Sequence, residues 1–99
     1  MLGGRVIVSM VRAHIIVKGL VQGVYYRVTT KQKADSLDLS GWVKNLPDGD
    51  VEVVVEGNKE KIEQLIDWCW QGPPGAKVDG VEVKWSPCQN EYQGFNIVF

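Results

Sequence analysis

The most informative stretch for the fold is LSGWVKNLPDGDVEVVVE, residues 39–56, which holds two strand-like segments around a turn. Leu39–Asn45 alternates in the manner of a strand, and Val51–Glu56 puts three valines on one face. Between them, LPDG (residues 46–49) is a strong turn signal, because proline fixes φ, aspartate bonds the local backbone and glycine accepts a positive φ. The stretch therefore predicts a β-hairpin.

Helical patterns lie on both sides of this hairpin. Residues 25–37 precede it, and one face of a helix there would carry Tyr26, Thr30, Ala34 and Leu37. Residues 59–70 follow it, with Ile62, Leu65, Ile66 and Cys69 at the spacing of an amphipathic helix. Asn58 is placed to cap the start of this second helix, and Gly72 is placed to end it in a left-handed conformation.

Strand patterns flank the two helices in turn. Arg12–Lys18 and Val78–Trp85 both alternate, and a polar loop leads to a final short strand, Phe95–Val98. The order is βαββαβ with a possible fifth strand. We therefore predict an α+β, ferredoxin-like sandwich, with a mainly antiparallel sheet of four or five strands and two helices on one face.

The composition indicates one small domain without a bulk charge. The 99 residues carry a net charge of −1, which excludes the basic field expected of a nucleic-acid or membrane-surface protein. Cys69 and Cys88 form no CxxC pair, and with His14 as the one histidine they predict free thiols and no metal site. We expect a cytoplasmic monomer without cofactors, with a leader at 1–11 and the domain at 12–99.

The chemistry is predicted to lie in GLVQGVYYR, residues 19–27, at a strand-to-helix junction. Backbone N–H groups at such a junction have no intrahelical partner, and two glycines let the loop curl so that these groups converge on an anion. Arg27 follows in the first turn of the helix, and its planar guanidinium suits bidentate contact with a phosphoryl group. The segment is not a Walker A loop, since no Gly-Lys-Ser/Thr follows.

These residues resemble a known family. GLVQGVYYR resembles the first acylphosphatase signature, G-x-V-Q-G-V-x-F-R, and GWVKNLPDG (residues 41–49) resembles the second, G-[WY]-[VA]-x-N-x-x-[DN]-G. A third, weaker match is Gly72-Pro73-Pro74, and the resemblance covers residues 12–99. It implies a hydrolase that cleaves the carboxyl–phosphate anhydride bond of small acyl phosphates to a carboxylate and inorganic phosphate.

The resemblance also implies residue roles. A phosphate-binding loop would be formed by the backbone amides of Gln22, Gly23, Val24, Tyr25, Tyr26 and Arg27. The guanidinium of Arg27 would hold the same phosphoryl group, and the side-chain amide of Asn45 would position the attacking water. The motifs offer no side chain as a base or nucleophile. Water would therefore attack phosphorus directly, without a metal or a phosphoenzyme.

One departure from the family pattern lies beside the arginine. The family usually has phenylalanine where this chain has Tyr26, and a small or variable residue where it has Tyr25. The Tyr26 ring can still pack in the core, but its hydroxyl then needs a hydrogen-bond partner. These changes bear on turnover and substrate range more than on the type of reaction.

Two alternative functions stay open from the sequence. Ferredoxin-like sheets can bind RNA through aromatic residues on central strands, although His14–Lys18 and Val51–Glu56 contain none. A non-catalytic anion-binding module is the other, since acylphosphatase-like domains also occur in larger hydrogenase-maturation proteins.

Overall fold

The protein is described by a computed structural model that covers residues 9–99. Its elements are β1 (Met10–Leu20), α1 (Tyr26–Ser36), β2 (Ser40–Asn45), β3 (Val51–Asn58), α2 (Lys59–Gln71), β4 (Lys77–Pro87) and β5 (Phe95–Ile97). The predicted order of strands and helices is confirmed, and the fifth strand is present.

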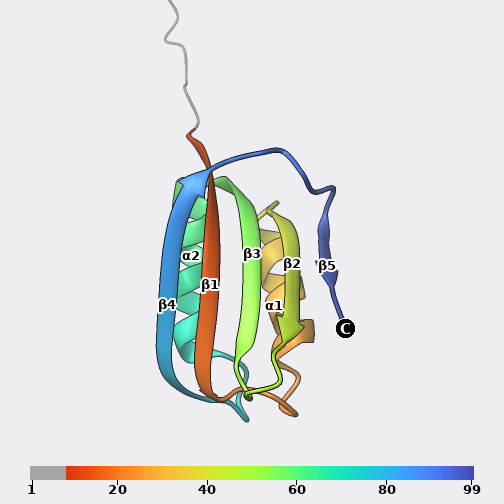
Figure 1. Ribbon diagram of the computed structural model, residues 1–99, viewed down its shortest axis with the longest axis vertical. Coiled ribbons are helices and arrows are strands. Elements are labelled where there is room, and N and C mark those ends of the chain that lie inside the picture. The colour runs from red at the N-terminus through yellow and green to blue at the C-terminus, as the bar shows by residue number, and fades with distance from the viewer. Residues whose placement is uncertain (1–8) are drawn as a thin grey trace, which may run out of the picture.

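The five strands form one sheet in the order β4-β1-β3-β2-β5. The first four strands pair antiparallel, whereas β5 pairs parallel with β2. Figure 1 shows both helices on one face of this sheet, with the opposite face left uncovered by helices. The predicted ferredoxin-like sandwich is therefore confirmed, with a mixed sheet.

Three strands, β1, β3 and β4, are longer than their sequence patterns indicate. Met10 and Val11 belong to β1 because they pair with Asn58 and Gly57 of β3. The predicted bounds were Arg12–Lys18 for β1, Val51–Glu56 for β3 and Val78–Trp85 for β4. The extra residues pair with a neighbouring strand but do not extend the alternation that the sequence shows. Residues 1–8 of the expected leader lie outside the described residues.

The core lies between the sheet and the helices. Alternate residues of the central strands are fully buried: Ala13, Ile15 and Val17 on β1, and Val51, Val53 and Val55 on β3. The helices contribute the buried faces that were predicted, with Tyr26, Thr30, Ala34 and Leu37 from α1 and its C-terminal end, and Ile62, Leu65 and Cys69 from α2. Only Ile66 of the predicted α2 face is half-buried.

The ends of α2 are held by local geometry. Asn58 Oδ1 accepts hydrogen bonds from the N–H groups of Glu60 and Lys61, at 2.9 and 3.2 Å, which confirms the predicted N-cap. Gly72 has the predicted positive φ of 65°, but its ψ of −175° is extended rather than left-handed helical.

Within residues 9–99, neither helix is long and apolar enough to cross a membrane.

A buried carboxylate fastens the segment between β4 and β5 to the sheet. Glu56 is 2% exposed, and its two oxygens accept hydrogen bonds from the N–H groups of Gln89 and Glu91, at 2.7 and 3.1 Å. Further along, the N–H of Gly41 donates to the carbonyl of Gly94 at 3.0 Å. These bonds deliver β5 to the outer edge of β2 (Figure 1).

Candidate active site

The β1–α1 loop (residues 21–25) turns the chain from β1 into the first turn of α1. Gly23 has a φ of 74° and Tyr25 a φ of 65°, whereas the residues beside them have negative φ. This alternation directs successive N–H groups into one concavity, the backbone arrangement called a nest, which binds anions. Tyr25 holds a conformation that costs a non-glycine residue on the order of 1–3 kcal/mol, as is common at functional sites.

The N–H groups of this loop are free to meet a ligand. No acceptor among residues 9–99 takes a hydrogen bond from the backbone amides of residues 22–27. A Cβ atom placed on Gly23 would meet no other atom within 4 Å, so the space beside this glycine is open. The N-terminus of α1 adds its dipole at the same point.

Arg27 projects from the first turn of α1. Its guanidinium forms no ion pair with any carboxylate of residues 9–99. Its contact is with the ring of Phe99, whose centroid lies 4.9 Å from Cζ. Because this aromatic contact leaves the charge uncompensated, the guanidinium is available to an anion.

Asn45 is the last residue of β2, where the hairpin begins to turn. The turn is closed by hydrogen bonds from Leu46 N–H to the Asp50 carbonyl at 2.8 Å and from Asp50 N–H to Asp48 Oδ1 at 3.0 Å. The side-chain amide of Asn45 has no hydrogen-bond partner among residues 9–99. It can therefore both donate to and accept from a bound molecule.

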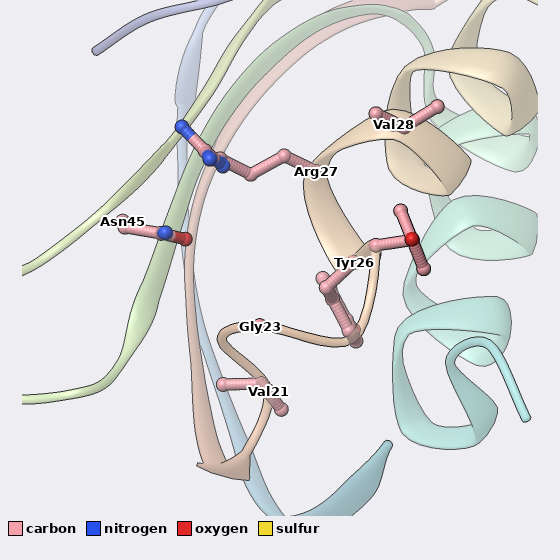
Figure 2. Close-up of a pocket in the computed structure, with 7 residues that line it drawn as sticks. Val21, Gly23, Tyr26, Arg27, Val28 and Asn45 are labelled. Carbon is pink, nitrogen blue, oxygen red and sulfur yellow. The ribbon is translucent and has the colours of Figure 1, made fainter. Parts of the chain in front are cut away.

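These groups surround one cavity of about 310 Å³. Its lining consists of Val21, Gly23, Tyr25, Tyr26, Arg27, Val28 and Asn45. Figure 2 shows the side chains of Arg27 and Asn45 extending into the same space beside the loop at Gly23. A cationic fork, an uncommitted amide and a row of backbone donors thus face a single small pocket, which suits a phosphorylated small molecule.

Tyr26 and Cys69 stay protonated at neutral pH. Burial raises the pKa of the Tyr26 phenol, and it raises the pKa of the Cys69 thiol to about 12, although the nearby Tyr26 hydroxyl opposes the second shift. Neither group can serve as a base or as a thiolate nucleophile at neutral pH. Both belong to the core rather than to the chemistry.

The Tyr26 hydroxyl has the partner that its burial requires. It donates to the carbonyl of Cys69 at 2.7 Å, and the ring packs against Trp68 with centroids 5.4 Å apart. Replacing Tyr26 with phenylalanine leaves this carbonyl without that donor. We expect the free energy of unfolding, measured by urea denaturation, to fall by about 1–3 kcal/mol.

The matched control for this prediction is Tyr25→Phe. Tyr25 is 80% exposed, so loss of its hydroxyl should leave the midpoint of denaturation where it was. Equal midpoints for Tyr26→Phe and wild type would show that the buried hydrogen bond contributes nothing.

The predicted site residues fall into two groups in the structure. Arg27 and Asn45, from segments 18 residues apart in the sequence, line the same cavity, as do Gly23, Tyr25 and Tyr26. The side chains of Gln22 and Val24 do not line it. Val24 packs against the core, and Gln22 reaches toward the β2–β3 turn.

Comparison with known proteins agrees with this geometry. The family model described as acylphosphatase matches residues 13–97. The chain belongs to the acylphosphatase family. An acylphosphatase of Pelotomaculum thermopropionicum is 50% identical over 91 residues, which span 92% of this chain and 99% of that protein.

Solved structures agree as well. The crystal structure of acylphosphatase from Bacillus subtilis is 36% identical and superposes with a TM-score of 0.87 over 90% of this chain and 99% of that one. Full-length HypF in its phosphate- and nucleotide-bound form is 29% identical with a TM-score of 0.81, covering 98% of this chain but 13% of HypF. Family and fold together identify an enzyme that hydrolyses acyl phosphates.

Sequence reasoning missed part of the cavity. Val21 and Val28 line it, and Phe99 lies against Arg27, although the family resemblance assigned none of these residues a role in the site. Val21 and Val28 flank the two ends of the loop, so their place in the first signature segment and in the next turn was the available signal. Phe99 carries no such signal, because its position depends on the parallel pairing of β5 with β2.

Proposed function

We propose that this acylphosphatase-family protein hydrolyses acyl phosphates by direct, in-line attack of water on phosphorus. The observation that carries the proposal is the convergence of Arg27, Asn45 and the free amides of the β1–α1 loop on one cavity. The leaving group is a carboxylate, which departs readily. Positioning and electrostatic stabilisation can therefore provide most of the catalysis.

Each group has a separate task in this mechanism. The loop amides and the Arg27 guanidinium hold the phosphoryl oxygens and stabilise the charge that they carry in the transition state. The side-chain amide of Asn45 orients the water for attack on the face opposite the leaving carboxylate. An oxygen of the substrate phosphate takes the proton of the water, since the cavity is lined by no carboxylate, histidine or cysteine side chain.

The donor set supports a metal-free reaction without a phosphoenzyme. Among residues 9–99, no group of three or more His, Cys, Asp or Glu side chains is placed to hold a metal ion. The cavity instead offers the donors that bind phosphoryl groups directly. The cavity lining also contains no serine, cysteine, histidine or aspartate side chain that could accept the phosphoryl group, which favours attack by water itself.

A cytoplasmic monomer fits these features. Arg27, Asn45 and the β1–α1 loop meet in one cavity within a single chain. Cys69 and Cys88 are free thiols, as expected in a reducing compartment.

Hydrolysis of benzoyl phosphate in the presence of EDTA tests the proposal. We expect wild-type turnover to survive chelation unchanged, because Arg27 and the loop amides supply the charge stabilisation. Turnover that falls on chelation and returns with added Mg²⁺ would contradict the metal-free mechanism.

A non-catalytic anion-binding role is the second candidate, and the likeness to HypF is the observation that favours it. That role predicts that inorganic phosphate binds while benzoyl phosphate stays intact. Isothermal titration with phosphate, run beside the turnover assay, separates the two functions.

A further inference from the structure

The side chain of Gln22 leaves the β1–α1 loop and joins it to the opposite wall of the site. Its Nε2 atom donates to the carbonyl of Leu46 at 2.7 Å and to the carbonyl of Asp50 at 2.8 Å. Both amide protons are thereby used, and the side chain is half-buried. Gln22 therefore binds two points of the β2–β3 turn at once.

These two carbonyls frame the position of Asn45. Leu46 follows Asn45 directly in the chain, and Asp50 precedes Val51, the residue paired with Asn45 across the hairpin. The same amide group thus holds the end of β2, where Asn45 lies, and the start of β3 opposite it.

Gln22 is the principal link between these two parts of the site. Among residues 9–99, the hydrogen bonds that join residues 21–25 to residues 45–50 all come from its side chain. The nearest other link is the ion pair of Lys18 with Asp50 at 3.9 Å, in which Lys18 is 47% exposed. Exposed pairs of this kind contribute little.

We propose that Gln22 is a positioning residue that sets the spacing between the phosphate-binding loop and Asn45. The inference rests on the proposed function, in which the loop holds phosphorus and Asn45 holds the attacking water. The loop and Asn45 lie on separate segments of the chain, so an in-line attack of the water on phosphorus needs a fixed distance between them. A displacement of about 1 Å can reduce a rate about 10²-fold.

The proposal separates turnover from binding. The phosphoryl group is held by backbone amides and Arg27, none of which needs the Gln22 side chain. Replacing Gln22 with methionine removes both hydrogen bonds at similar length. We expect kcat for benzoyl phosphate to fall by about 10–100-fold, whereas the affinity for inorganic phosphate changes little.

Gln22→Glu supplies a readout that a purely structural role would not move. A carboxylate at this position has no proton to donate and would face two carbonyl oxygens, whereas the protonated acid regains one O–H donor. We therefore expect kcat of Gln22→Glu, relative to wild type, to rise as the pH falls through the range in which the introduced carboxylate becomes protonated. The same ratio for Gln22→Met should stay constant with pH.

The control is Gln64→Glu, which places the same charge on the exposed face of α2 and should match wild type throughout. Each kcat is divided by the folded fraction, determined by circular dichroism under assay conditions. Wild-type kcat in Gln22→Met, or equal losses of kcat and phosphate affinity, would overturn the positioning role. An inactive wild type would instead overturn the proposed function and this inference with it.

Discussion

Replacement of Arg27 with alanine is expected to reduce kcat/KM for benzoyl phosphate by roughly 10³–10⁵-fold, the range over which an arginine contributes to phosphoryl transfer. The guanidinium lines the cavity and forms no ion pair within residues 9–99, so no neighbouring carboxylate diverts its charge. Steady-state kinetics of the purified variant measures the loss.

Arg27→Lys tests the geometry of the contact apart from its charge. Lysine keeps the positive charge but lacks the planar fork that meets two phosphoryl oxygens at once. We expect it to recover little of the activity. Recovery close to wild type would show that a point charge suffices. Lys33→Ala, at the far end of α1, is the control for Arg27→Ala, because it also removes one charge from this helix.

Asn45→Ala is expected to abolish most turnover while sparing phosphate affinity. The side-chain amide of Asn45 makes no hydrogen bond within residues 9–99, and its removal leaves the loop and Arg27 intact. Loss of one preorganised donor costs on the order of 10²–10³ in rate. The comparison of kcat with the inhibition constant of inorganic phosphate measures the two effects separately.

Asn45→Asp should be more harmful than Asn45→Ala. A carboxylate there faces the phosphoryl dianion, and each charge pair at about 4 Å costs about 4 kcal/mol at an effective dielectric of 20. Phosphate affinity should therefore fall together with kcat. Full activity in Asn45→Ala would disprove the water-positioning role. The matched control is Asn96→Ala, because Asn96 is an exposed residue of β5.

Local patterns were sufficient to predict the framework. The hairpin at 39–56 and the face shared by Tyr26 and Ala34 depend on periodicity and turn chemistry, which the sequence displays directly. The two signatures also predicted that Arg27 and Asn45 would belong to one site, and both line the same cavity.

Features that depend on distant partners could not be predicted. The burial of Glu56 depends on amides more than thirty residues away, at Gln89 and Glu91. The left-handed backbone of Tyr25 runs against the preference of an aromatic residue, so the local sequence gives no sign of it. The tether from Gln22 likewise needs the β2–β3 turn to be folded beside the loop.

The three-residue strand β5 has a consequence for how copies of this protein behave toward one another. Without it, β2 would expose a row of unpaired N–H and C=O groups, a template for addition of a strand from another molecule. By pairing parallel with β2 from Gly41 to Val43, β5 occupies that edge and leaves only a very short strand in its place. By holding β5 in place, the loop anchored by Glu56 therefore reduces the tendency of the β2–β3 hairpin to pair with other copies at high protein concentration.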